Sequence, residues 1–266
     1  MRYLKTYRVF ESAPTLTEDQ FGWLNRCTQG SWKLNHTTGL LDVDGYFGCD
    51  QQDLTDFKGV AFGHVKGNFY CYNNQLTSLV GAPQTVGGGF YCNNNQLTSL
   101  DGAPQTVSSF SCENNRLTSL KGAPQSVDGD FYCYNNLLTS LEGAPRTVGR
   151  GFSCHDNQLT SLEGAPQTVD GSFFCYHNLL TSLEGAPQTV VWNFSCNGNP
   201  VSKETLASIF ALMKKGKSYQ QALEEHWPKM GNDDRALMYK QMPNLPPEEV
   251  RKYQALATVN RMKGYL

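Results

Sequence analysis

Phenylalanine, cysteine and leucine recur through the middle of the chain at a fixed interval of about 21 residues. The string FYCYNNQLTSL begins at Phe69, and a nearly identical string, FYCYNNLLTSL, begins at Phe131. Variants of the same string begin at Phe90, Phe110, Phe152 and Phe173. The unit reads F-x-C-x-x-N-x-L-T-S-L-x-G-A-P-x-x-V. Self-similarity at such a period predicts a solenoid in which each repeat forms one turn.

The spacing inside the unit predicts the elements of each turn. Phe and Cys are two residues apart, so a short strand would place both side chains on the same side. About 21 residues are too few for a strand plus a full α-helix, and the Gly-Ala-Pro turn favours an extended or polyproline-like return leg. We therefore expect stacked turns with a parallel sheet of short strands and an interior of Phe, Cys, Leu and Val. Since no turn can bury its apolar side alone, neighbouring turns must stabilise one another.

An asparagine follows the cysteine by three residues in every repeat. We expect its amide to be buried and to bond the backbone of adjacent turns, because buried polar groups are almost always hydrogen-bonded. The members of this structural asparagine ladder are Asn74, Asn95, Asn115, Asn136, Asn157, Asn178 and Asn199.

The unit also contains the pattern LxLxxNxLxxL, which is the leucine-rich repeat signature, here with Phe and Cys in the first two apolar positions. It resembles the short repeats of bacterial effector proteins, whose turns read much like NNQLTSLP. The fuller unit, LTSLEGAPQTV joined to FYCYNN, is similar to leucine-rich repeat proteins encoded by tailed bacteriophages. The resemblance covers residues 31–201 and implies a leucine-rich repeat solenoid with its strands on the concave face. It implies little about function, because such solenoids serve many roles.

A catalytic role that some of these effectors have is not implied here. They carry a C-terminal ubiquitin ligase domain with a catalytic cysteine. The last cysteine of this chain, Cys196, lies inside the repeats, and the tail after it is short.

Residues 1–30 are predicted to form an N-terminal cap. The segment RYLKTYRVFE alternates as a strand would, and Thr17 then opens a capping box with Gln20. A short helix carrying apolar residues should follow and end near Gly30.

The solenoid is predicted to span residues 31–201 and to begin with degenerate turns. Trp32 and Leu34 suit a short first turn. In the next turn the Phe, Cys, Leu and Val slots are filled by Phe47, Cys49, Leu54, Phe57 and Val65.

Residues 202–266 change to helical periodicity and are predicted to form a C-terminal α-helical module. Ser202 and Ser218 are N-cap residues for the first two helices, and Pro228 ends the second. A third helix and a fourth, which follows Pro246, complete the module, which we expect to dock on the last turn.

The cysteines point to a reducing compartment. Seven of the nine occur once per repeat, and no C-x-x-C pair is present. They are interpreted as small buried side chains with free thiols. The N-terminus is too polar for a signal peptide, and no apolar run approaches the roughly 18–20 residues of a membrane span. We expect a soluble cytoplasmic protein, located in the bacterial host if it is phage-encoded.

No motif for catalysis or cofactor binding emerges. Gly216, Lys217 and Ser218 resemble the end of a phosphate-binding loop, but a helix precedes them where that motif requires a strand. The five histidines lack metal-ligand spacing. We therefore expect no cofactor, no metal and no enzymatic activity; an unrecognised catalytic site in the helical tail is the least favoured alternative.

The side chains that flank the repeated cysteine should point outward, onto the concave face. Tyrosines are frequent there, and Tyr is favoured at the energetic centres of protein interfaces. The alternative is that duplication merely copied a tyrosine. Predicted partner-binding residues are Tyr70, Tyr72, Tyr91, Glu113, Asp130, Tyr132, Tyr134, His155, Phe174 and Tyr176.

The distribution of charge predicts which kind of partner the surface attracts. Residues 31–201 hold 7 basic and 14 acidic residues, whereas residues 202–266 hold 11 basic and 7 acidic. An acidic solenoid repels nucleic acid and attracts a partner with a basic patch. The sequence thus predicts a protein-binding protein, and the phage resemblance implies a host protein as the partner, with a defence component among the candidates. The alternative is a glycan-binding or virion-associated adhesin, since aromatic platforms also stack on sugars.

Overall fold

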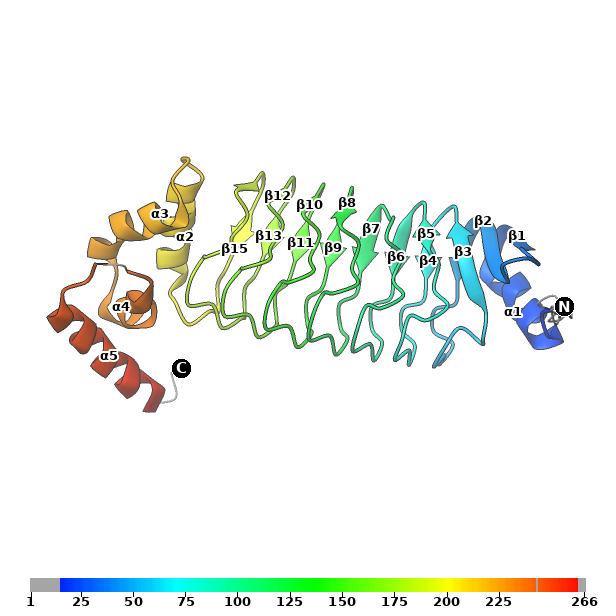
Figure 1. The fold of residues 1–266 in the computed structure, drawn as a ribbon, viewed down its shortest axis with the longest axis horizontal. Helices are drawn as coiled ribbons and strands as arrows, with labels where there is room; N and C mark the ends of the chain where they lie inside the picture. Colours follow the sequence, from blue (N-terminus) through cyan, green and yellow to red (C-terminus); the bar gives the residue numbers. More distant parts are fainter. Residues whose placement is uncertain (1–14, 243, 263–266) are drawn as a thin grey trace, which may run out of the picture.

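The computed structural model describes residues 15–242 and 244–262, with side chains to residue 260 except at position 239. The chain forms a parallel β-solenoid of about seven turns with a spacing of about 21 residues. Figure 1 shows these turns stacked side by side, between helix α1 at one end and a group of helices at the other. The strand predicted within RYLKTYRVFE lies outside the described residues.

The main sheet contains one very short strand from each turn. Its strands pair in parallel and in register, so that Phe110 lies beside Phe131, which in turn lies beside Phe152. The repeat strands are β4 (Phe69–Tyr70), β6 (Gly89–Tyr91), β7 (Ser109–Ser111), β9 (Phe131–Tyr132), β11 (Phe152–Ser153), β13 (Phe173–Phe174) and β15 (Phe194–Ser195). The predicted parallel sheet of short strands is confirmed.

The return legs are extended, as expected, and they also form strands of two residues. Four of them make a second parallel sheet. These strands are β8 (Ser126–Val127), β10 (Thr147–Val148), β12 (Thr168–Val169) and β14 (Thr189–Val190). A fifth, β5 (Thr85–Val86), joins the main sheet by pairing with β3 (Ala61–Val65). The valine of each pair is buried and closes the interior from this side.

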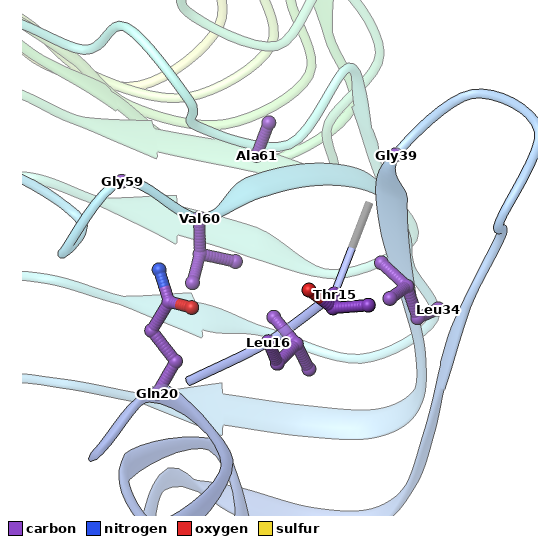
Figure 2. A pocket seen from close by; sticks show the side chains of 8 residues that line it. All are labelled: Thr15, Leu16, Gln20, Leu34, Gly39, Gly59, Val60 and Ala61. Atoms are coloured by element: carbon purple, nitrogen blue, oxygen red, sulfur yellow. The ribbon is translucent and has the colours of Figure 1, made fainter. Parts of the chain in front are cut away.

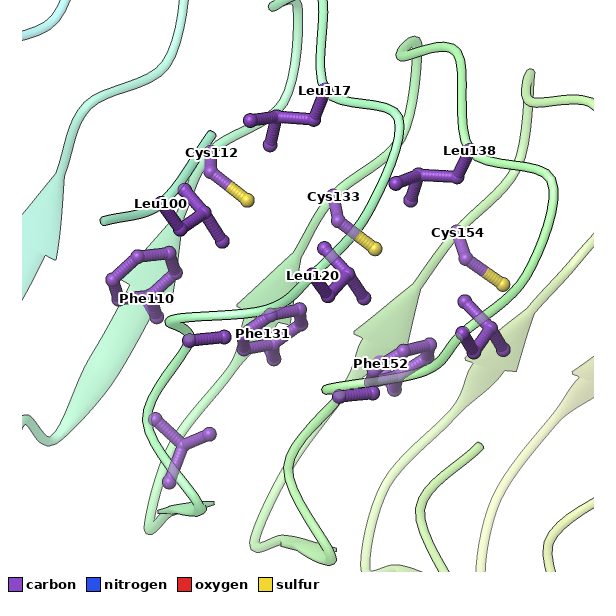
Figure 3. Close-up of a cluster of buried hydrophobic side chains, with 14 of the residues drawn as sticks. Leu100, Phe110, Cys112, Leu117, Leu120, Phe131, Cys133, Leu138, Phe152 and Cys154 are labelled. Carbon is purple, nitrogen blue, oxygen red and sulfur yellow. The ribbon is translucent and has the colours of Figure 1, made fainter. Parts of the chain in front are cut away.

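The interior consists of columns of identical side chains (Figure 3). The phenylalanine rings of successive turns, from Phe47 to Phe194, stack at centroid distances of 5.2–5.8 Å. All nine cysteines are buried and free. Burial raises the pKa of thiols such as Cys71 and Cys133 well above the ordinary value, so they stay protonated and pack as small apolar groups.

The asparagine ladder is confirmed. The Asn136 amide nitrogen donates to the carbonyl oxygens of Cys112 and Cys133, both at 3.1 Å. Its Oδ1 accepts a hydrogen bond of 3.0 Å from the Leu117 amide. Each ladder residue thus links its own turn to the preceding one. The residue before it has a left-handed backbone, as at Asn135 with φ 51°, a conformation that asparagine tolerates well.

The N-terminal end is a helix followed by a hairpin. Helix α1 (Glu18–Cys27) has the predicted capping box between Thr17 and Gln20. It ends at Cys27 rather than near Gly30, because β1 (Thr28–Leu34) begins directly after it.

Strand β1 pairs antiparallel with β2 (Leu40–Gly48). The prediction that Trp32 and Leu34 begin a first turn is therefore wrong. The physical reason is a tight turn between the strands, where the Asn35 side chain accepts from the Thr37 amide at 2.9 Å.

The degenerate turn after the hairpin follows the repeat as predicted. Strand β2 pairs in parallel with both β3 (Ala61–Val65) and β4. The residues assigned to the repeat slots are all buried, and they are Phe47, Cys49, Leu54, Phe57 and Val65.

The C-terminal module contains the four predicted helices. They are α2 (Lys203–Met213), α3 (Tyr219–His226), α4 (Asn232–Met238) and α5 (Pro247–Met262), with 3₁₀ turns at Trp227–Lys229 and Tyr239–Gln241. Ser202 and Ser218 cap α2 and α3, as predicted.

The module docks on the solenoid. The ring of Phe210 stacks on Phe194 of the last turn at 3.9 Å, and the Gln241 side chain donates to the Thr181 carbonyl at 3.1 Å. Asp234 of α4 accepts hydrogen bonds from Ser202 and Thr205, which ties α4 to the start of α2. None of the described helices combines the length and apolar character needed to cross a membrane.

Candidate functional site

The outward side of the main sheet carries two columns of side chains, and we call this surface the strand face. Alternation along each strand directs Phe and Cys inward and the residues next to Cys outward. The first column, between Phe and Cys, is Gly48, Tyr70, Tyr91, Ser111, Tyr132, Ser153, Phe174 and Ser195. The second, directly after Cys, is Asp50, Tyr72, Asn93, Glu113, Tyr134, His155, Tyr176 and Asn197.

The N-terminal half of the strand face holds one aromatic cluster. Tyr70 and Tyr91 are stacked, with centroids 5.1 Å apart and planes inclined by 17°. Tyr72 meets Tyr70 edge-on at 6.1 Å. The Asn68 amide donates to the Tyr70 hydroxyl at 2.5 Å, which fixes the direction of that ring. All three tyrosines are partly exposed.

The C-terminal half holds a second aromatic cluster. Here the His155 ring lies between Tyr134 and Tyr176, at centroid distances of 4.3 and 4.2 Å and nearly parallel to both. Tyr132 and Phe174 flank this stack, at 6.3 Å from Tyr134 and 6.4 Å from Tyr176. The five rings extend over three successive turns of the solenoid.

A carboxylate holds the central histidine in place. Asp156 accepts hydrogen bonds from Nδ1 of His155 at 2.7 Å and from Nδ1 of His177 at 3.1 Å. His155 and His177 thus lie near each other on adjacent turns, as the sequence suggested. Within the described part of the chain, no group of three or more potential ligands could hold a metal ion.

Glu113 and Ser111 lie between the two clusters, and both are buried. Glu113 is 6% exposed, and its Oε2 accepts a 2.6 Å hydrogen bond from the Ser111 hydroxyl. Burial raises the pKa of the Glu113 carboxyl above its ordinary value. The expectation that Glu113 points into solvent is therefore wrong: it is in the outward column, but the longer side chains of neighbouring turns cover it.

Asp130 lies at the edge of the strand face and is partly buried. Its Oδ1 accepts a 2.8 Å hydrogen bond from the Gly151 amide. Burial, together with the negative charge of Asp130, raises the pKa of Tyr132 to about 12, so the Tyr132 hydroxyl keeps its proton and remains a donor. The ion pairs among the described residues include neither Asp130 nor Glu113.

The structure therefore places nine of the ten predicted partner-binding residues, partly exposed, on one side of the sheet, in two aromatic clusters with Asp130 beside them, whereas Glu113 is buried between the clusters. Sequence reasoning missed three further residues at the N-terminal end of this surface, Tyr46, Gly48 and Asp50. The signal for two of them was present. The string FGCD at Phe47 aligns with FYCY at Phe69 and assigns Gly48 and Asp50 to the two columns.

A separate small pocket lies at the N-terminal end of the solenoid, between the start of α1 and the first strands (Figure 2). Its lining is mostly backbone and aliphatic side chains, among them Leu16, Leu34 and Val60. The one amide that lines it, from Gln20, already bonds the Lys58 carbonyl and the Thr17 backbone. This pocket belongs to the packing of the end cap, because its lining is largely aliphatic and its amide already has partners within the chain.

A scan of protein-family models finds none that matches the chain, and none of the curated proteins matches it. No relative therefore assigns an activity to the strand face.

Proposed function

We propose that this chain is a non-enzymatic recognition protein that holds a protein partner on its strand face. The observation that carries the proposal is the pair of aromatic clusters, eight partly exposed rings on one side of a rigid backbone. Tyr is enriched among interface residues that contribute most to affinity. Rings on a regular solenoid lose little conformational freedom on binding, which lowers the entropic cost of association.

The contacts among the rings support pre-organisation. Tyr70 packs on Tyr91, and His155 is fixed by two rings and by Asp156. A partner would therefore meet side chains that are already ordered. At two positions of the first column a serine replaces the aromatic residue, and these serines, Ser111 and Ser153, are buried below the level of the rings. The surface varies from turn to turn, which gives it the irregular relief that a specific partner needs.

Charge favours a basic partner. The repeats carry an excess of acidic residues, and Asp130 at the edge of the strand face has no basic counterpart within the described chain. Such a field steers positively charged surfaces toward the strand face and repels nucleic acid.

We further propose that the solenoid is a leucine-rich repeat protein of the short type, and that the partner is a host protein of a bacteriophage, a defence component among the candidates. The buried leucine columns and the asparagine ladder support the first part. The second part rests on the resemblance of the repeat to phage-encoded proteins. Nine buried free thiols are consistent with a cytoplasmic location.

Glycan binding is the second candidate, and the ring geometry argues against it. A sugar stacks on the open face of an aromatic ring. Both faces of His155 are covered by tyrosines, and one face of Tyr91 is covered by Tyr70. These stacked faces are closed to a sugar, and the ring edges and hydroxyl groups beside them suit hydrogen bonds and side-chain contacts with a protein.

Affinity capture from a host lysate tests the proposal. The wild-type chain should retain one protein stoichiometrically, whereas the double variant Tyr132→Ala, Tyr134→Ala should lose about a thousandfold in affinity, because two such anchors contribute about 2 kcal/mol each. Trp192→Ala is the matched control, since Trp192 is 70% exposed but lies off the strand face. Equal capture by the double variant would contradict the proposal. A response on a glycan array that depends on the same tyrosines would favour the adhesin instead.

A further inference from the structure

A second pocket opens at the N-terminal end of the strand face, next to the first aromatic cluster. Tyr46, Tyr70 and Tyr72 form its aromatic walls, Gly48 and Asp50 lie between them, and Arg26 lines its helix side. Its volume is about 350 Å³, which is enough for the end of a long side chain.

The pocket exists because the repeat is interrupted at one position. Gly48 pairs with Tyr70 in the sheet and occupies the column position that Tyr70 and Tyr91 fill in the next two turns. Tyr91 covers one face of Tyr70, and with glycine at position 48 no ring from the described residues stacks on the other. A Cβ atom on Gly48 would meet the Asp50 carboxylate at 3.4 Å and the Tyr70 ring at 4.0 Å, which are ordinary contacts, so the backbone there does not itself require glycine.

Asp50 supplies an unbalanced negative charge to this aromatic pocket. It makes no ion pair among the described residues. Its proximity to Tyr72 is evident in the pKa of that phenol, which is raised by burial and then by the Asp50 charge. The Tyr46 ring, half-exposed, is held close over the backbone at Gly67, where a Cβ atom would collide with it.

The arginine on the rim, Arg26, makes no ion pair with Asp50. Its Nη1 lies back along its own helix, 3.3 Å from the place where a Cβ of Gly22 would be. The Asp50 carboxylate accepts a long hydrogen bond of 3.5 Å from the neighbouring Gln51 side-chain amide and has no ion-pair partner among the described residues.

We propose that this pocket receives an arginine side chain of the protein partner, with the guanidinium stacked on the open face of Tyr70 and paired with Asp50. Guanidinium groups stack on aromatic rings and pair with carboxylates, and both partners are present here. The inference rests on the proposed function, since the arginine belongs to the partner on the strand face. The inference assigns the positive charge expected of that partner to one arginine, the one that enters this pocket.

A fluorescent hexa-arginine peptide, with a hexa-citrulline peptide as its neutral counterpart, tests the pocket on the full chain. The wild type should bind the arginine peptide and bind the citrulline peptide at least about tenfold more weakly, because a charge-assisted hydrogen bond contributes about 1.5–3 kcal/mol. Asp50→Asn and Gly48→Tyr should each reduce arginine-peptide binding by a similar factor. Asp101→Asn removes an equal charge from an exposed turn and should change binding less than about twofold. A hexa-lysine peptide should bind more weakly than hexa-arginine, because ammonium cannot stack.

Circular dichroism and the melting temperature establish that the variants are folded, and Asp50→Asn carries the test if Gly48→Tyr perturbs the sheet. Equal arginine-peptide binding by wild type and Asp50→Asn would overturn the pocket, as would no preference over citrulline. The double variant Tyr132→Ala, Tyr134→Ala should bind the arginine peptide as the wild type does. If arginine-peptide binding depends on Asp50 but the Tyr132→Ala, Tyr134→Ala variant still captures the partner as the wild type does, the proposed function alone is refuted. If partner capture depends on Tyr132 and Tyr134 but arginine-peptide binding does not depend on Asp50, the pocket alone is refuted.

Discussion

Substitution of one ladder asparagine, Asn136→Ala, should destabilise the solenoid more than its size suggests. The side chain makes its contacts inside the protein, where water cannot replace them, since Asn136 is 6% exposed. The Leu117 amide loses its acceptor, the Asn136 Oδ1 at 3.0 Å. The Cys112 and Cys133 carbonyls lose one donor each but keep another, from Asn115 and Asn157 respectively.

The expected loss of stability can be worked out because the orphaned N–H and the two carbonyls that keep a donor have different costs. An orphaned buried N–H costs about 1–3 kcal/mol, and each hydrogen bond lost from a carbonyl that keeps a second donor costs about 0.5–1 kcal/mol. Together these predict a loss of about 3 kcal/mol. The same change at Asn199, which is partly exposed at the end of the ladder, should cost only about 1 kcal/mol because water can reach its partners.

Denaturant unfolding followed by far-UV circular dichroism measures the difference. The matched control is Asn135→Asp, next to the ladder on the exposed side, where the equivalent position of the following turn already holds Asp156. It removes one exposed hydrogen bond, from the Asn135 amide to the Asn114 side-chain oxygen, and should cost less than about 1 kcal/mol. If Asn136→Ala were no more damaging than Asn135→Asp, the ladder would not hold the turns together.

Three further predictions concern other parts of the molecule. Glu113→Gln should make the protein more stable at neutral pH. Burial raises the pKa of the Glu113 carboxyl in the folded chain, so folding favours its protonated form and the wild type loses stability as the pH rises through that range. Thermal melts at several pH values should show that the advantage of Gln vanishes in acid. Phe210→Ala should lower the free energy of unfolding by about 3 kcal/mol and loosen the helical module from the last turn, because the Phe210 ring stacks on Phe194. Hydrogen exchange in α2 and α3 should then rise, and unchanged exchange would contradict the docking. A thiol reagent should modify fewer than about one of the nine cysteines in the native chain and all of them in denaturant, since burial keeps them protonated; rapid native modification of several would refute the packing of that column.

Much of the fold could be predicted because its information is local and repeated. The interval between Phe131 and Phe152 defines the turn, and alternation around Cys133 defines which side chains are inside. The ladder residue follows from simple chemistry, since a buried amide needs partners and only adjacent turns can provide them. The helix caps at Thr17, Ser202 and Ser218 follow from equally local rules.

What the sequence did not predict depends on contacts between turns. Trp32 and Leu34 alternate as a repeat strand does, and only the pairing of β1 with β2 shows that they belong to a hairpin. The second sheet arises because each Thr-Val pair finds the same pair one turn away, a match that no single repeat reveals.

The candidate surface was predictable in outline and not in detail. The two outward columns follow from strand alternation alone. The burial of Glu113 does not, because it depends on how far side chains of neighbouring turns extend over it. The open face of Tyr70 was likewise not predicted, because it results from the absence of a side chain at Gly48.

Side-chain footprinting of the wild-type chain, alone and bound to the protein it captures, tests the central claim most directly. Tyr132, Tyr134 and Tyr176 are partly exposed in the free chain, and Trp192 is more exposed than most large apolar side chains described. The account predicts that the three tyrosines lose reactivity in the complex while Trp192 keeps it. Tyrosines that react equally in both states, with protection moved to Trp192 or to the helical module, would contradict it.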